Sequence, residues 1–180
     1  MKRGVFGVLL MLWLAGNALA DCQLTLSRPD LDYGKVRNKD YSGQLKRWKT
    51  LNDRQVQLTA VCDSPVRMAV FTHGGEQDDG FRFASDSVVL VAASNATLDG
   101  NPVMLGKTSS HAPFINSGSP GDKNMLRNNE GLLPVSGETI LAGRQFSITL
   151  TVRPALSERD TEVKDKTTLE SHLHFNVETE

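Results

Sequence analysis

The amino-acid sequence predicts an all-β protein of the sandwich type. Residues 22–27, 54–62 and 146–152 alternate between apolar and polar side chains, as half-buried strands do. No window shows the apolar repeat of a helix with capping residues at its ends. About eight short apolar segments are joined by turn-rich stretches, and this spacing is typical of a β-sandwich.

The first twenty residues have the layout of an export signal. A basic start precedes an apolar stretch over residues 5–15, and a small-x-small cleavage pattern ends at Ala20. A retained anchor helix is the alternative, but the apolar stretch is short for one. Lipid attachment at Cys22 would need a small residue before the cysteine, and Asp21 does not provide one. We predict a signal over residues 1–20 and a single domain over residues 21–180.

Cys22 and Cys62 are the only cysteines, and a cysteine pair in an exported chain is expected to form a disulfide rather than remain as two thiols. Both occupy inward positions of their predicted strands, so a bridge between paired strands is reasonable. It would close a loop of about 41 residues, for which the chain-entropy model gives roughly 4 kcal/mol of stabilisation.

More strands are expected after the second cysteine. They cover residues 66–70, 81–83, 88–91, 98–105 and 146–152, and an alternating stretch over residues 169–177 closes the chain. Asp99, Gly100 and Asn101 predict a tight hairpin turn. Residues 37–53 and 108–131 are predicted as two long loops, and loops of that length are usually functional or mobile.

The sequence carries none of the common catalytic motifs, so we expect a protein that is not an enzyme. Residues 117–121 are interpreted as a flexible loop. His172 and His174 are interpreted as a solvent-facing pair without a third metal ligand. Asp78 and Asp79 predict a turn, because the alternating oxygens of a calcium loop are missing. We expect no metal and no cofactor, and the near-neutral charge argues against nucleic acid as a partner. A small exported enzyme is the least favoured hypothesis.

One stretch of the chain is strongly basic. Residues 35–54 contain seven basic and two acidic residues, whereas the rest of the chain after residue 20 contains 11 basic and 19 acidic residues. Tryptophan and arginine are enriched at contact sites. We therefore predict an adhesive contact for an anionic partner, such as a glycan, a lipid headgroup or a neighbouring subunit, at Lys46, Arg47, Trp48 and Lys49. The alternative is a solvated loop that keeps the protein soluble.

These features together resemble a subunit of chaperone–usher fimbriae from Gram-negative bacteria, in particular the fimbrial-like proteins. The resemblance is carried by the export signal, by residues 21–27 running on to residues 31–34, by the second cysteine at the end of residues 56–62, and by the alternating stretch near the carboxyl end. It covers the whole exported chain.

The resemblance implies an immunoglobulin-like sandwich that lacks one strand and is completed by a donor strand from another chain. The first and last strands would form the walls of the acceptor groove, which would be lined by Leu24, Leu26, Leu169, Leu173, Phe175 and Val177. A donor that buries about five large apolar residues would gain ~1.5–3 kcal/mol for each.

The implied function is that of a structural or adhesive subunit of a surface fimbria. The implied partners are a periplasmic chaperone, an outer-membrane usher, other fimbrial subunits and a host or surface ligand. The implied location is the periplasm in transit and then the cell-surface fimbria. A self-contained exported β-sandwich that binds a ligand without entering a fimbria is the alternative function.

Two features depart from the family pattern. Only Asp21 precedes Cys22 after the predicted cleavage, whereas ordinary subunits carry an extension there. We therefore expect the chain to receive a strand without donating one, which suits a tip or chain-ending position. Many pilins also end beside an aromatic residue, whereas this sequence ends with Thr179 and Glu180.

Overall fold

A computed structural model of the chain describes residues 21–161 and 168–180, so the predicted export signal lies outside the described residues. The strands are β1 (Cys22–Leu26), β2 (Gly43–Leu45), β3 (Trp48–Thr50), β4 (Arg54–Gly74), β5 (Glu76–Gln77), β6 (Gly80–Arg82), β7 (Val88–Leu98), β8 (Asn101–Pro102), β9 (Met104–Thr108), β10 (Lys123–Met125), β11 (Glu130–Ser136), β12 (Thr139–Ile140), β13 (Ala142–Leu156) and β14 (Leu173–Thr179). The helical elements are a single 3₁₀ turn, η1 (Asn38–Asp40), and the short α1 (Glu158–Thr161). In this described part of the chain, no helix has the length and apolar character needed to cross a membrane.

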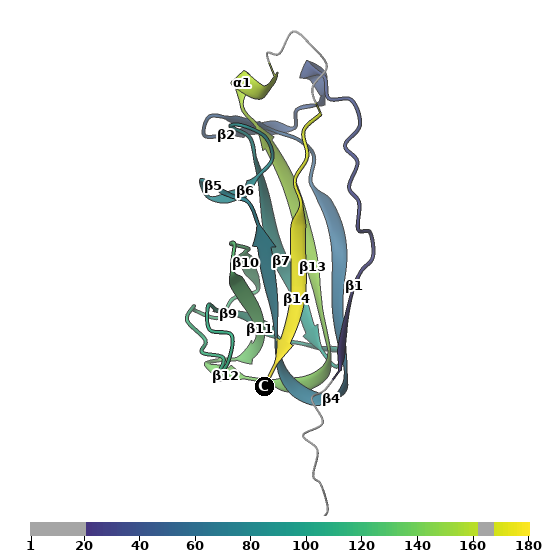
Figure 1. The fold of residues 1–180 in the computed structure, drawn as a ribbon, viewed down its shortest axis with the longest axis vertical. Coiled ribbons are helices and arrows are strands. Elements are labelled where there is room, and N and C mark those ends of the chain that lie inside the picture. Colours follow the sequence, from purple (N-terminus) through teal and green to yellow (C-terminus); the bar gives the residue numbers. More distant parts are fainter. Residues whose placement is uncertain (1–20, 162–167) are drawn as a thin grey trace, which may run out of the picture.

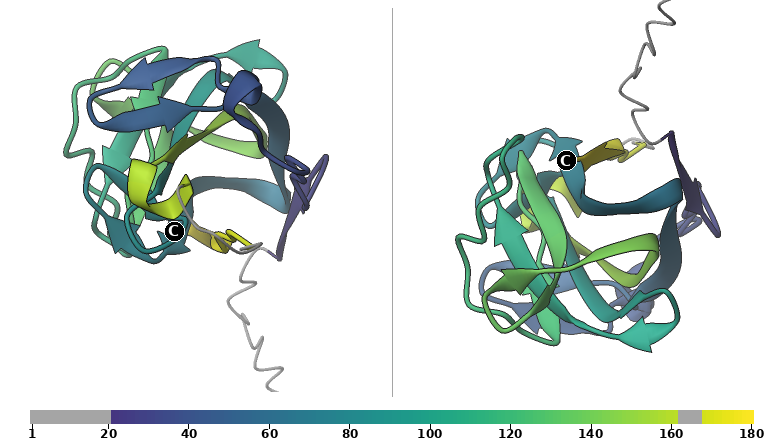
Figure 2. Two further views of the ribbon diagram at one scale, coloured as in Figure 1. Left: turned by 90° about the horizontal axis from the view of Figure 1, so that it is seen from above. Right: turned by 90° about the horizontal axis from the view of Figure 1, so that it is seen from below.

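Strand β4 belongs to both layers of the sandwich (Figure 1). Its first half, up to Cys62, pairs with β1 on one side and with β13 on the other. Its second half, from Met68, pairs with β14 and with β11. Beyond these neighbours, β7 extends the first layer and β9 extends the second. All these pairings are antiparallel, and the end-on views of Figure 2 show the strands surrounding one interior.

The main core fills the space between the two layers. The alternating positions of a strand point inward, so every second side chain is buried from Val56 to Cys62 in the first half of β4. Residues 68–72 of its second half are buried on both faces. The first layer contributes Leu58, Ala60, Phe146, Ile148 and Leu150, and the second contributes Met68, Val70, Leu105 and Leu132. A smaller core lies on the opposite face of the second layer, where Phe114 from the 108–131 segment packs on Phe71 and Leu133.

This architecture confirms the predicted all-β, immunoglobulin-like sandwich, with antiparallel sheets that do not close into a barrel. Several strands are longer than the short ones predicted. Residues 54–62 and 66–70 are parts of one strand of 21 residues, because the backbone stays extended through Asp63, Ser64 and Pro65. The closing strand begins at Leu173, four residues later than the predicted start at Leu169.

The two predicted long loops are only partly irregular. Residues 37–53 contain the hairpin of β2 and β3, which turns at Lys46, a residue with a φ of 53°. The predicted loop over residues 108–131 contains β10 and the beginning of β11. The prediction of unbroken loops was therefore wrong, because strands of three residues are too short to show an alternating pattern.

Candidate functional site

Strands β1 and β14 lie beside each other without pairing (Figures 1 and 2). Each of them pairs with β4 alone, β1 in the first layer and β14 in the second. In the part of the chain that the structure describes, each strand therefore has one edge that no other strand occupies. We call the line between these two edges the β1–β14 seam.

The hydrogen-bond pattern shows which backbone groups of β1 face the seam. Ser27 donates to the carbonyl of Gln57 at 2.9 Å, and Asp63 donates to the carbonyl of Asp21 at 3.2 Å. In an antiparallel pair, hydrogen-bonded residues alternate with residues whose N–H and C=O point the other way. The backbone groups of Leu24 and Leu26 therefore point away from β4 and toward the open edge.

The same reasoning applies to β14. Glu180 donates to the carbonyl of Arg67 at 3.1 Å, so the even-numbered residues of β14 face β4. The backbone groups of Leu173, Phe175 and Val177 therefore point into the seam.

The side chains of these same residues pack against the main core. Leu24, Leu26, Leu173, Phe175 and Val177 contact the core cluster but remain only partly buried, whereas most inward residues of the inner strands, such as Leu58 and Ile148, are fully buried. The seam thus combines open backbone groups with incompletely covered apolar side chains. Thr72, which faces Phe175 across the β4–β14 pair, is fully buried, and its hydroxyl has no hydrogen-bond partner among the residues that the structure describes.

The seam is narrow where β1 and β14 come closest. Parts of β1 and β14 approach each other to within 8 Å between Cα atoms. A strand inserted between two others needs roughly 9.6 Å, since adjacent strands lie about 4.8 Å apart. Insertion of a strand therefore requires the two edges to move apart.

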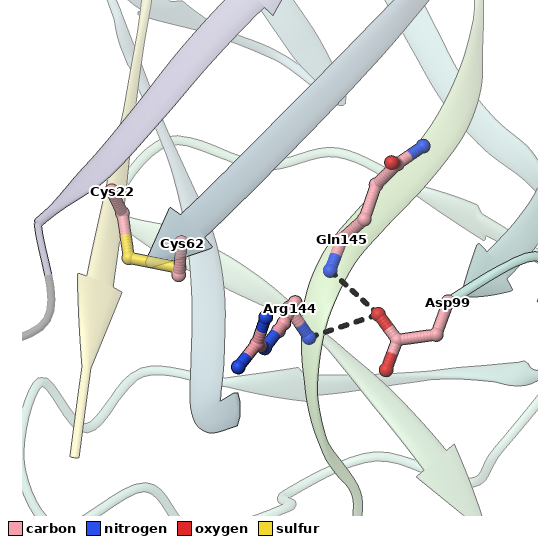
Figure 3. The surroundings of a disulfide bond; sticks show 5 residues. All are labelled: Cys22, Cys62, Asp99, Arg144 and Gln145. Atoms are coloured by element: carbon pink, nitrogen blue, oxygen red, sulfur yellow. Dashed lines mark hydrogen bonds between the residues drawn. A yellow bond between two sulfur atoms is a disulfide. The ribbon is translucent and has the colours of Figure 1, made fainter. Parts of the chain in front are cut away.

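A disulfide fixes one end of β1. Cys22 and Cys62 are direct cross-strand partners, with 4.1 Å between their Cα atoms, and they form the bridge expected from the sequence. Figure 3 shows this bridge near a second anchor. The carboxylate of Asp99, in the predicted hairpin turn between β7 and β8, accepts hydrogen bonds from the backbone N–H groups of Arg144 and Gln145 at 2.9 and 2.8 Å. These bonds hold the irregular start of β13, where its register against β4 shifts.

The segment that follows β1 is attached to the first layer through Tyr33. The Tyr33 hydroxyl donates to the carbonyl of Val152 at 3.1 Å, and the Arg54 guanidinium lies 4.5 Å from the centre of the Tyr33 ring. Burial raises the pKa of Tyr33 to about 12. Close by in the chain, Asp53 and Arg153 form a two-point ion pair, and the hydrogen bond from Arg153 holds the pKa of Asp53 below its usual range.

The predicted adhesive residues lie on the β2–β3 hairpin. Trp48 is only 4% exposed, and its ring N–H donates to the carbonyl of Asp86 at 2.9 Å. The ring therefore belongs to the core and is not offered to a partner, which corrects the expectation of an exposed tryptophan. Lys46, Arg47 and Lys49 remain at the surface.

The basic charge of this hairpin is matched by carboxylates from distant parts of the chain. Lys46 pairs with Asp79 and Arg47 with Asp78, both at 2.9 Å, and Lys49 lies 3.7 Å from Glu158. The hydrogen bond from Lys46 holds the pKa of Asp79 below its usual range. The three basic side chains of the hairpin are therefore each balanced by a carboxylate in the fold.

The remaining predicted residues lie apart from these features. Leu169 is partly buried but precedes β14, and it is not among the residues that pack against the main core. His172 and His174 are exposed, as expected. Among residues 21–161 and 168–180, no three histidine, cysteine or acidic side chains are placed to hold a metal ion. A hollow of about 730 Å³ is lined by residues 114–120, by residues 138–140 and by Arg67.

Sequence reasoning missed the polar residues on the outward side of β14. Asn176, Glu178 and Glu180 are hydrogen-bonded to groups on β4 and on the 108–131 segment. The alternation in the sequence predicts that these side chains point outward. Their partners lie at least 66 residues away along the chain, so no local pattern reveals them.

Comparisons with known proteins complete this description. No protein-family model matches the chain. The crystal structure of the P pilus rod subunit PapA is similar at 11% sequence identity and a TM-score of 0.42, covering 88% of this chain and 99% of PapA. The uncharacterized protein YhcE of Escherichia coli (strain K12) is 30% identical over 185 residues, covering 99% of each chain. Identity at this level over the whole length places the chain in the same protein family as YhcE.

Proposed function

We propose that this protein is a subunit of a bacterial surface fimbria and that it accepts a β-strand from another polypeptide at the β1–β14 seam. One observation carries the proposal. On both edges, the residues whose backbone N–H and C=O groups point away from β4 are also the residues whose apolar side chains are only partly buried. An extended segment with apolar residues at alternate positions matches both features at once.

The physical chemistry of the seam supports an incoming strand. Open strand edges are sites of aggregation, and soluble proteins usually cover or charge them. Here Leu24, Leu26, Leu173, Phe175 and Val177 make the inward side of both edges mainly apolar, and no charged side chain points into the seam from β1 or β14. A donor strand would pair with both edges and complete the burial of five side chains: Leu24, Leu26, Leu173, Phe175 and Val177.

The partners in this proposal follow from export. The disulfide is typical of an oxidising compartment such as the periplasm. A periplasmic chaperone would supply the first strand, and another fimbrial subunit would replace it at an outer-membrane usher. The assembled subunit would then lie on the cell surface.

The test is to add a synthetic peptide with apolar residues at alternate positions to the purified, oxidised protein. Its control is a peptide of the same composition with the apolar residues in one block. Native mass spectrometry should show a one-to-one complex with the alternating peptide only. Amide hydrogen exchange should slow at Leu24, Leu26, Phe175 and Val177, and it should stay unchanged at Thr25 and Asn176, whose N–H groups already face β4.

Two variants on one strand separate the seam from the outer face. Phe175→Asp should abolish binding, because the new carboxylate would lie in the seam. His174→Asp should leave binding intact, because His174 is exposed on the opposite side of β14. A peptide methylated on its backbone nitrogens provides a test without any change to the protein, and it should not bind.

A stable monomer that binds no alternating peptide and already protects the seam amides would refute the proposal. That result would favour the self-contained exported binding domain.

A further inference from the structure

The outward side of β14 is tied to the rest of the protein at three successive outward-facing residues. Asn176, Glu178 and Glu180 each form hydrogen bonds with groups outside the strand. We call these three residues, together with their partners His73, His111, Phe114 and Arg67, the β14 latch. Its members come from β4, from β14 and from the 108–131 segment.

The first two ties involve histidine side chains. Nε2 of His73 lies 2.8 Å from Oδ1 of Asn176, and the other ring nitrogen lies 2.9 Å from Oδ1 of Asn129. Nδ1 of His111 lies 2.9 Å from a carboxylate oxygen of Glu178. The side-chain amide of Asn176 also donates to Glu178 at 3.0 Å, so the two ties are connected along the strand.

The third tie involves the 108–131 segment and β4. The carboxylate of Glu180 accepts a hydrogen bond from the backbone N–H of Phe114 at 2.7 Å, and it lies 3.2 Å from the Arg67 guanidinium. The 108–131 segment is itself well anchored, because Phe114 is only 6% exposed in the smaller core. The His111 ring stacks on Phe71, with 4.4 Å between the ring centres.

The other wall of the seam is held in a different way. Strand β1 is joined covalently to β4 by the disulfide at its first residue. Its side-chain hydrogen bonds to β4 are few: the Thr25 hydroxyl donates to the carbonyl of Thr59 at a long 3.4 Å, and the hydroxyl of Ser27, the residue after β1, accepts from the Gln57 N–H at 2.9 Å. One wall is therefore fastened by a covalent bond, and the other by partly exposed polar contacts, which are individually weak.

We propose that β14 is the wall that moves when the seam admits a strand, and that the β14 latch sets how readily it moves. This inference rests on the proposed function. The seam is too narrow for an inserted strand, so at least one edge must shift. The covalent bond restrains β1, and the latch is the polar side-chain restraint on the outward side of β14, opposite the apolar side chains that pack on the core. The latch therefore controls access to the seam from its outer side, without contacting the incoming strand.

The experiment measures amide hydrogen exchange at residues whose N–H groups bond to β4. These are His174 and Asn176 in β14, and Gln23 and Thr25 in β1. The variants are Glu178→Ala and the double variant Glu178→Ala/Glu180→Ala in the oxidised protein. The matched control is Glu130→Ala, which removes the 2.8 Å ion pair with Lys107 in the same layer without touching β14.

Glu178→Ala, which removes the contacts with His111 and Asn176, should speed exchange at His174 and Asn176 by about fivefold. The double variant, which also removes the contacts of Glu180 with Phe114 and Arg67, should speed it by about tenfold or more. Gln23 and Thr25 should stay within about twofold of the wild type. The Glu130→Ala control should change neither pair. Equal acceleration in β1 and β14, or no acceleration in β14, would overturn the inference.

The rate of binding of the alternating peptide provides the second measurement. The latch variants should bind this peptide about fivefold faster than the wild type, and Glu130→Ala should bind it at the wild-type rate. Equal rates in all variants would refute control by the latch while leaving the proposed function intact. Faster exchange in β14 with no binding by any variant would refute the proposed function instead, and the latch would stand as a restraint on β14.

Discussion

The carboxylate of Asp160 accepts a 2.6 Å hydrogen bond from the hydroxyl of Ser87, although 73 residues separate the two in the sequence. It also accepts hydrogen bonds from the Ser85 hydroxyl and, at 3.0 Å, from the backbone N–H of Asp86. Burial opposes ionisation of this group, but the hydrogen bonds prevail and lower the pKa of Asp160 to about 2. The cluster ties α1 to the start of β7 and fixes the direction in which the chain leaves β13.

This cluster predicts a specific acid sensitivity. The pKa of Asp160 lies below its ordinary value of 3.8, so its stabilising effect is complete above that pH and is lost as the pH falls toward 2. The shift corresponds to on the order of 2 kcal/mol. Urea unfolding at pH 7 should show Asp160→Asn less stable than the wild type by about that amount. The difference should shrink at pH 2.5, and a constant difference would contradict this account.

Removal of the disulfide should destabilise the fold and loosen β1. The double variant Cys22→Ala/Cys62→Ala should lose about 4 kcal/mol of unfolding free energy, because the bridge no longer restricts the unfolded chain. Urea unfolding gives the loss, and the reduced wild type should match the variant. A loss below about 1 kcal/mol would show that strain in the native bridge offsets the entropic gain.

A close contact in the second layer predicts a position that tolerates no side chain. A Cβ atom at Gly131 would lie 2.9 Å from the Phe71 ring, so Gly131→Ala should cost about 1–3 kcal/mol. The matched control is Gly118→Ala, whose Cβ would meet the Lys107 side chain at 3.4 Å and should cost less than about 0.5 kcal/mol. Thermal unfolding of both variants checks this difference, and similar costs would contradict it.

The ion pairs of the β2–β3 hairpin predict opposite effects from two sets of charge changes. If the hairpin is a contact for an anionic partner, Lys46→Glu/Arg47→Glu/Lys49→Glu should elute from heparin at lower salt than the wild type. Asp78→Asn/Asp79→Asn should elute at higher salt, because it frees Lys46 and Arg47 from their partners.

The control for this prediction changes the net charge elsewhere. Asp63→Asn/Asp122→Asn alters the charge by the same amount at exposed positions away from the hairpin. If this control elutes from heparin at the same salt concentration as Asp78→Asn/Asp79→Asn, the response reflects net charge alone. The hairpin is then a solvated surface and not a contact site.

Alternation predicted the strands that have one face in the core. The period of two is visible at residues 22–26, 54–62 and 146–152 because each of these segments contributes one side to the core and one to solvent. The turn at Asp99 and Gly100 was also predictable, since both residues adopt positive φ values there, 50° and 81°. Strand β11 escaped detection because it is buried almost throughout and contains Pro134.

The site was only partly predictable for a related reason. The inward residues Leu24, Leu26, Leu173, Phe175 and Val177 follow from alternation, and they do lie along one seam. The burial of Trp48 depends on the carbonyl of Asp86, 38 residues away, and the charge balance of the hairpin depends on Asp78 and Asp79. The pairing of distant strands brings these residues together. A short stretch of the sequence around Trp48 therefore does not include Asp86, Asp78 or Asp79, and its pattern cannot predict these contacts.

The continuity of β4 has a mechanical consequence. Its two halves pair in opposite layers, and the strands on either side of it run along the long axis of the molecule (Figure 1). The first half of β4 pairs with β1 and β13, and its second half pairs with β14 and β11, so one uninterrupted stretch of backbone joins the two layers covalently. A shift of either layer is therefore passed to the other through the backbone of β4.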